Sequence, residues 1–105
     1  MGVEYRGCLC VGYTYEELEE LMEEFPIVSS EGPYEWCEEN GVSSYSPYYD
    51  ADHEDCIFGN SVATSGDYSY AEVQPGLDER IQQVQSRLLK QFGKQPKVYI
   101  MAHGW

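Results

Sequence analysis

Positive charge is scarce in this sequence of 105 residues, which has six Lys and Arg against 19 Asp and Glu. Arg6 is the only base in residues 1–79, whereas residues 80–105 hold the other five bases and no acid. The formal net charge is −13. A field of this sign repels phosphate groups, so we expect neither nucleic acid nor an anionic membrane as a direct partner.

Long apolar segments are missing as well. No run approaches the roughly 18 residues that a membrane-spanning helix needs, and no basic and apolar leader is readable at the start. We therefore expect a cytoplasmic protein. A chain of this length suits a single core, so we expect one acidic domain over residues 1–105.

Sequence motifs that would indicate catalysis are also scarce. Neither the GxxxxGK nor the GxGxxG pattern of nucleotide-binding loops occurs. Carboxylates are so abundant that their presence identifies no acid–base pair. A field this negative would also raise the pKa of a nearby thiol and weaken it as a nucleophile. We therefore expect no enzymatic activity and no cofactor.

Four residues leave a metal site open as an alternative: Cys8 and Cys10 in a C-x-C pattern, and His53 and Cys56 in an H-x-x-C pattern. Structural zinc sites usually show C-x₂₋₄-C knuckles, so this pattern is weak evidence, and small buried thiols are the ordinary explanation. A zinc- or thiol-dependent module remains the alternative from a different functional class.

The first third of the chain has clear local signals. Alternating apolar residues over 3–11 predict a strand. Thr14 and Glu17 have the spacing of a capping box, so a helix is expected to begin at Tyr15, and Pro26 ends it.

Residues 26–55 are rich in Tyr and acid and lack a sustained period. They predict a long ordered loop or insertion with a short helical turn near 33–40. Residues 56–63 and 67–73 predict a β-hairpin whose turn contains Gly66.

The end of the chain is again regular. Leu77, Ile81, Val84 and Leu88 recur at helical spacing and predict a second helix that stops at Gly93. Residues 97–105 predict a closing strand.

This order of elements predicts an α+β fold, a two-layer sandwich in which an antiparallel sheet of about four strands carries two helices on one face. It is the split βαβ or ferredoxin-like order β-α-β-β-α-β. The second strand stays open, because residues 43–50 could supply it instead and would shift the pairing.

The first helix carries six glutamates on the arc opposite its apolar stripe. Like charges such as Glu16 and Glu20, at i and i+4, destabilise a helix by about 0.2–0.5 kcal/mol per pair. An ordinary solvated face would explain one such helix. That explanation weakens because the acids continue to Asp55 without an intervening base, whereas proteins that only need solubility mix both signs.

Closely spaced carboxylates offer a basic groove the fixed negative charge that it finds on a nucleic-acid backbone. Aromatic residues among them would anchor a protein partner. The candidate partner-binding residues are Glu16, Glu17, Glu19, Glu20, Glu23, Glu24, Glu31, Glu35, Glu38, Glu39, Tyr45, Tyr48, Tyr49, Asp50, Asp52, Glu54 and Asp55.

In composition and size, over its whole length, the chain resembles the nucleic-acid-mimicking inhibitors of phages and other mobile elements, such as anti-CRISPR and anti-restriction proteins. It is similar in the same way to acidic immunity proteins that neutralise nuclease toxins. No motif is shared, so no residue role is carried over. The resemblance implies an inhibitor that occupies a basic, nucleic-acid-handling protein, and we expect it to be a monomer or homodimer.

The basic tail has two possible arrangements. Arg80, Arg87 and Lys94 recur at a spacing of seven, with Lys90 close to the same arc. These cations either neutralise the first helix or lie away from it and leave the molecule dipolar. We favour separation, because 19 acids against six bases leave most of the acidic surface uncompensated.

Overall fold

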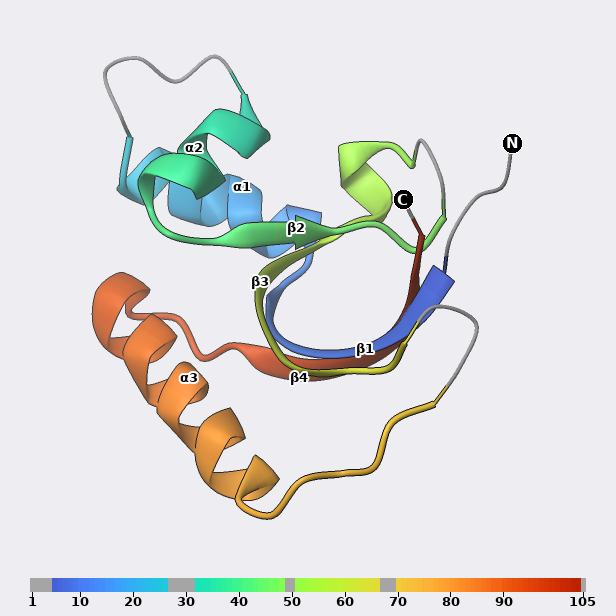
Figure 1. The fold of residues 1–105 in the computed structure, drawn as a ribbon. Helices are drawn as coiled ribbons and strands as arrows, with labels where there is room; N and C mark the ends of the chain where they lie inside the picture. Colours follow the sequence, from blue (N-terminus) through green and yellow to red (C-terminus); the bar gives the residue numbers. More distant parts are fainter. Residues whose placement is uncertain (1–4, 27–31, 49–50, 67–69, 105) are drawn as a thin grey trace.

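The computed structural model describes residues 5–26, 32–48, 51–66 and 70–104 (Figure 1). Along the chain the elements are β1 (Tyr5–Tyr13), α1 (Tyr15–Glu24), α2 (Pro33–Glu39), β2 (Ser43–Tyr45), the 3-10 helix η1 (His53–Asp55), β3 (Ile57–Thr64), α3 (Leu77–Phe92) and β4 (Lys97–Gly104). Within these residues, no helix has the length and apolar character needed to cross a bilayer.

The strands form one four-stranded antiparallel sheet in the order β2-β3-β1-β4. Strand β1 is central, so that Val11 lies opposite Asn60 of β3 on one side and Val98 of β4 on the other. The predicted α+β class with a four-stranded antiparallel sheet is therefore confirmed.

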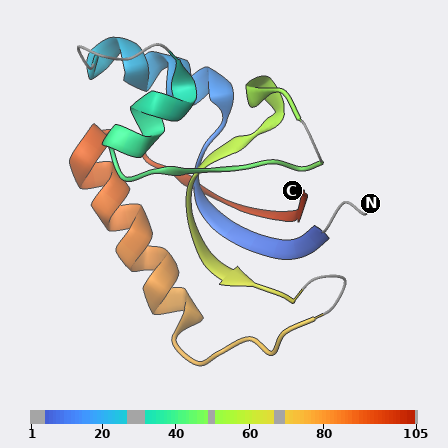
Figure 2. The ribbon, with the colours of Figure 1, turned by 45° about the horizontal axis from the view of Figure 1, so that its top comes forward.

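The helices share one hydrophobic core with one face of the sheet. Alternate residues of β1, Val11 and Tyr13, are buried in it together with Leu18 of α1, Trp36 of α2 and Leu88 of α3. Helix α3 lies along one side of the sheet, and α1 and α2 gather at one end of it (Figure 2). All three helices are thereby fixed to a common scaffold.

The predicted hairpin is wrong. Strand β3 covers most of its first arm, but residues 70–73 of the second arm form no strand, and residues 67–69 lie outside the described residues. The remaining strand is β2, Ser43–Tyr45, from the open alternative at 43–50, and it lies inside the stretch expected to be a loop.

Contacts that are distant in sequence explain this pairing. Ser43–Tyr45 pairs with β3, the Tyr45 hydroxyl accepts a hydrogen bond from the Ser61 amide at 2.9 Å, and the preceding Val42 is buried. Residues 70–73 are exposed and have no such burial. With α2, the described residues contain three α-helices, whereas two were expected. The ferredoxin-like order is not confirmed.

Strands β1 and β3 curve strongly, and the hollow side of the sheet faces away from α3 (Figure 1). Gly12 of β1 and Gly59 of β3 lie opposite each other, and a Cβ at either would collide with the backbone of the neighbouring strand. The curvature brings the end of β4 under the segment after β2, where the Ser46 amide lies 3.1 Å from Nδ1 of His103.

Candidate protein-binding face

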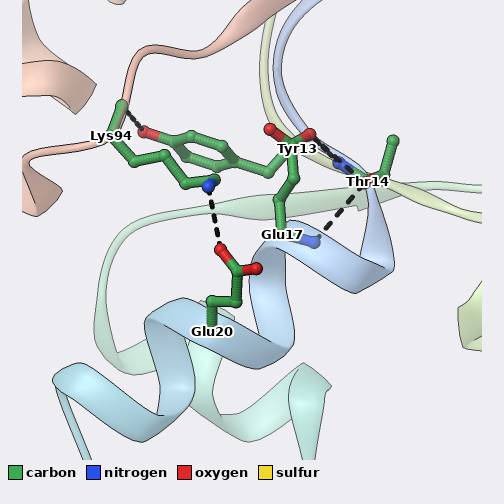
Figure 3. Close-up of polar contacts among 5 residues, drawn as sticks. All are labelled: Tyr13, Thr14, Glu17, Glu20 and Lys94. Carbon is green, nitrogen blue, oxygen red and sulfur yellow. Dashed lines mark hydrogen bonds and ion pairs between the residues drawn. The ribbon is translucent and has the colours of Figure 1, made fainter.

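A side-chain capping box fixes the start of helix α1. The Glu17 amide donates to Oγ1 of Thr14 at 3.5 Å, and the Thr14 amide donates to Oε1 of Glu17 at 3.1 Å (Figure 3). Leu18 and Leu21 are buried beneath the helix. The predicted cap and the predicted start at Tyr15 are both confirmed.

Because the apolar stripe faces the core, the acids of α1 face outward. The exposed ones are Glu16, Glu19, Glu20, Glu23 and Glu24. Six acids in ten residues, at a rise of 1.5 Å per residue, give one charge per about 2.5 Å of axis, compared with roughly 1.7 Å in duplex DNA. The helix therefore approaches the linear charge density of a nucleic-acid duplex over about three turns.

Glu17 differs from the other acids of α1 because it is half-buried and serves the cap. Burial first, and then the charge of Glu17, raises the pKa of Tyr13 to about 12. Burial and Glu17 likewise raise the pKa of Tyr99. Glu17 thus stabilises the start of α1 through the capping box. Its contact with a partner stays a prediction.

Helix α2 adds acids beside those of α1. Trp36 and Cys37 are buried, and the Trp36 indole donates to the Phe25 carbonyl at 2.7 Å, which ties α2 to the end of α1. The exposed acids of α2 are Glu35, Glu38 and Glu39. Next to them a surface hollow of about 570 Å³ opens between α2 and β2, lined in part by Tyr34, Glu38 and Ser44.

An aromatic cluster holds η1 against both helices. The ring of His53 lies 4.6 Å from that of Tyr15 and 6.4 Å from that of Tyr34, and both tyrosines contact Phe58 of the core. Asp52, Glu54 and Asp55 are exposed around η1. Helix α1 thus contacts acid-bearing elements on two sides, α2 and η1.

We call the exposed acids of these three neighbouring elements the acidic cap. Its residues are Glu16, Glu19, Glu20, Glu23, Glu24, Glu35, Glu38, Glu39, Asp52, Glu54 and Asp55. In Figure 1 the three elements occupy the upper part of the molecule and α3 the lower part. The structure thus brings together acids that are up to 39 positions apart in the sequence.

The candidate tyrosines have different environments. Tyr48 is 44% exposed, and its hydroxyl donates to Oδ2 of Asp55 at 2.6 Å, a bond that raises the pKa of Tyr48 to about 12. Tyr45 is half-buried, with its ring 5.6 Å from that of His103. Glu31, Tyr49 and Asp50, also among the predicted residues, lie outside the described residues.

The set of candidate residues omits Tyr34, although this tyrosine lies among the acids in the sequence. Its side chain is 48% exposed beside the acids of α2, while its ring contacts His53 and Phe58. Its place among the acids was the signal that could have included it, and Trp36 of the same stretch is buried in the core.

The cations are mostly apart from the cap. Lys94, beyond the end of α3, forms an ion pair with Glu20 at 2.9 Å (Figure 3). Arg87 instead donates to the side chain of Asn60. For Arg80 and Lys90 no ion pair with an acid occurs within the described part of the chain. The expected separation is therefore incomplete, because one cation of the stripe pairs with one glutamate of α1.

The four residues of the metal alternative lie in two places. Cys8 and Cys10 are on β1, whereas His53 is in η1 and Cys56 follows it. The Cys56 thiol donates to the Asp52 carbonyl at 3.5 Å and lies 3.5 Å from the Ser46 hydroxyl. Among the described residues, no three or more His, Cys, Asp and Glu side chains are grouped to hold a metal ion.

Comparisons with protein-family models, with curated proteins and with solved structures find no match to this chain.

Proposed function

We propose that this protein is an inhibitor that binds a basic, nucleic-acid-handling protein through its acidic cap and so blocks access of the nucleic acid. The observation that carries the proposal is the exposure of acids on α1, α2 and η1 as neighbouring elements of one scaffold. The inhibitor itself has no direct contact with nucleic acid or membrane, and acts as a monomer or homodimer.

The arrangement of charge supports mimicry better than it supports solubility alone. Fixed carboxylates attract a basic groove over about a Debye length, roughly 8–10 Å at physiological salt, and raise the association rate. A surface that serves only solubility intersperses both signs. Here α1, α2 and η1 contain no Lys or Arg, and the bases lie on β1 (Arg6), on α3 and in the chain beyond α3.

Rigidity supports the same proposal. The Trp36 bond to Phe25 and the rings of Tyr15, Tyr34 and His53 hold the acid-bearing elements in fixed relation. A preorganised array loses little conformational entropy when it binds. The exposed faces of Tyr34 and Tyr48 can receive arginine side chains of the partner by cation–π stacking.

The test begins with affinity capture from the source cell, followed by purification of the captured protein. Its binding to labelled nucleic acid is then measured with increasing inhibitor. We expect direct competition, with an association rate that falls as salt rises. A captured partner that is neither basic nor nucleic-acid-binding, or one that still binds nucleic acid when the inhibitor is saturating, would contradict the proposal.

A triple variant of α1 tests whether the competition with nucleic acid depends on the acidic cap. Glu16, Glu19 and Glu23 are changed to Lys, and Glu20 is kept because it pairs with Lys94. We expect slower association, a weaker salt dependence and loss of competition, with the fold retained.

The matched control changes Glu72, Asp78 and Glu79 to Lys. These acids are also exposed but lie in and before the first turn of α3, away from the cap. The net charge changes equally, so a specific role for the cap predicts near-normal competition by the control. Equal loss in both variants would reduce the effect to total charge.

The identity of the partner distinguishes two versions of the proposal. A nuclease whose activity kills the cell that makes it would identify the protein as an immunity protein. A defence or restriction complex would identify it as an anti-CRISPR or anti-restriction inhibitor. Both versions use the same face.

A further inference from the structure

A second buried cluster lies on the sheet face turned away from the core. In β1, Leu9, Val11 and Tyr13 pack with the helices, so the alternating residues Cys8 and Cys10 point to the other face. The two cysteines are 2% and 0% exposed, yet they lie outside the core cluster that the helices share. Something on the hollow side of the sheet must therefore bury them.

Strand β4 supplies a third sulfur to this cluster. In the register of β1 and β4, Cys8 lies directly opposite Met101 and Cys10 opposite Tyr99. Directly opposite residues share one face with Cβ atoms about 4.5–5.5 Å apart. Cys8 and Cys10 are two residues apart on one strand, so they share this face as well. Two thiols and a thioether thus lie on one face of the neighbouring strands β1 and β4.

The curvature of the sheet closes this area from the other side. The Ser46 amide and the ring of Tyr45 contact His103 at the end of β4. The Tyr45 hydroxyl accepts from the amide of Ser61, the residue opposite Cys10 in β3. His103 lies opposite Arg6 in the register, so it shares this face with Cys8 and Cys10, and Tyr45 reaches across to it.

A cation also stands on this face. Arg6 precedes Cys8 by two residues, so it shares the same face of β1. It is the only base in residues 1–79. Placing that base beside two thiols favours a complex that carries net negative charge.

We propose that Cys8, Cys10 and Met101 form a binding site for one soft monovalent metal ion, Cu(I). Thiolate and thioether ligands select Cu(I), whereas zinc prefers four nitrogen or sulfur ligands in a tetrahedron. Binding replaces two S–H protons, which go to solvent, and no electron is transferred. The resulting bis-thiolate complex has a charge of −1, and the positive charge of Arg6 lies on the same face of β1.

Met101 is half-buried, whereas both cysteines are buried, so its flexible thioether is the most accessible of the three sulfur ligands. Ligand exchange from a Cu(I) donor would begin at Met101 and end at the thiols. This site is separate from the acidic cap, so its failure would leave the proposed inhibitor function untouched.

The test is an anaerobic titration of the reduced protein with Cu(I), in competition with the chromophoric chelator bicinchoninate. We expect one equivalent to bind and a thiolate-to-copper absorption band to appear in the ultraviolet. Cys8→Ser and Cys10→Ser should each weaken binding by at least about 100-fold, and Met101→Leu by about tenfold. Cys37→Ser, which changes a buried thiol on α2, is the matched control and should retain normal affinity.

Several results would overturn the site. They are no binding by the wild-type protein, equal loss of affinity in the Cys37→Ser control, or zinc binding as tightly as Cu(I). X-ray absorption of the wild-type complex keeps the proposal testable if a cysteine variant fails to fold. Three sulfur neighbours are expected, and nitrogen or oxygen neighbours in place of the thiols would contradict the assignment.

Discussion

Helices α1 and α3 pack on one core, but only α3 distributes its charge as helix stability requires. In α3, Asp78 and Glu79 lie in the first turn and Lys90 in the last, which complements the helix dipole. In α1, Glu23 and Glu24 lie in the last turn, where no base occurs. Such acids destabilise a helix by about 0.3–1 kcal/mol each. The charges at the end of α1 therefore oppose its stability, whereas Glu16 and Glu17 in its first turn complement the dipole.

The largest expected effect concerns whether α1 and α3 unfold as one cooperative unit. Leu18 of α1 and Leu88 of α3 are both fully buried. We expect Leu18→Ala and Leu88→Ala each to lower the free energy of unfolding by about 2–5 kcal/mol, measured by urea denaturation. A Leu18→Ala variant that loses only local structure, with α3 unaffected, would show that α1 folds separately.

The start of α1 gives the next largest effect. Thr14→Ala removes the hydroxyl half of the capping box and should cost about 0.5–2 kcal/mol in thermal or urea unfolding. Helix α3 has no side-chain cap at Gly76, so the comparison predicts that α1 depends more on a single polar residue. Thr14→Ser is the control and should keep the stability of the wild-type protein. Unchanged stability in Thr14→Ala would show that the capping box of α1 does not contribute to stability.

Tyr13 links the two helices, because its hydroxyl donates to the Lys94 carbonyl at 2.8 Å, just beyond α3. Tyr13→Phe should cost about 0.5–1.5 kcal/mol. The folded state raises the pKa of Tyr13 from 10.0 to about 12, so its contribution is fully present below pH 10 and is lost as the pH rises toward 12.

Stability measured between pH 9 and 12 checks that sign. The wild-type protein should lose stability over this range, and Tyr13→Phe should lose less of it. A steeper loss in the variant would show that ionisation of another group dominates.

Substitutions of the acids at the end of α1 should have opposite effects on stability and on partner binding. Glu23→Lys and Glu24→Lys should each stabilise the helix by about 0.3–1 kcal/mol, since a cation there complements the dipole. The same changes should slow partner association. Lys90→Glu, in the last turn of α3, is the control with the opposite charge change. It should destabilise α3 without slowing association with the partner. A variant of α1 that loses stability would contradict the comparison.

The smallest effect concerns Lys94, which lies just beyond α3 and pairs with α1. The Lys94 side chain pairs with Glu20 at the surface, and this pairing raises the pKa of Lys94. Exposed pairs contribute little to stability, so Lys94→Gln should barely move the melting temperature. Association with the partner should become slightly faster at low salt. Slower association would show that the partner also contacts the basic tail.

Much of the fold was predictable because its signals are local. The Thr14–Glu17 spacing gave the start of α1, Gly93 gave the end of α3, and alternation gave most of β1 and β4. Strand β2 was not fixed in this way, because three residues contain no period. Its place depends on the bond between Tyr45 and Ser61, which are 16 positions apart.

The candidate site was predictable in composition but not in arrangement. Outward acids on α1 follow from its apolar stripe. Their meeting with the acids near η1 depends on the rings of Tyr15, Tyr34 and His53, which no sequence spacing brings together. The pairing of Lys94 was open for the same reason, since it depends on the path of the chain after Gly93.

Gly12 and Gly59 are in close contact, so these two positions can serve as internal controls for loss of the fold in a mutational screen. Because any side chain there meets backbone atoms of the next strand, every substitution should abolish folding whatever the partner is. In a library screened for inhibition, depletion at these two positions calibrates the signal of a lost fold. Depletion at Glu16 or Glu38 can then be measured against that scale, so that acids needed for recognition are identified before the partner has a structure.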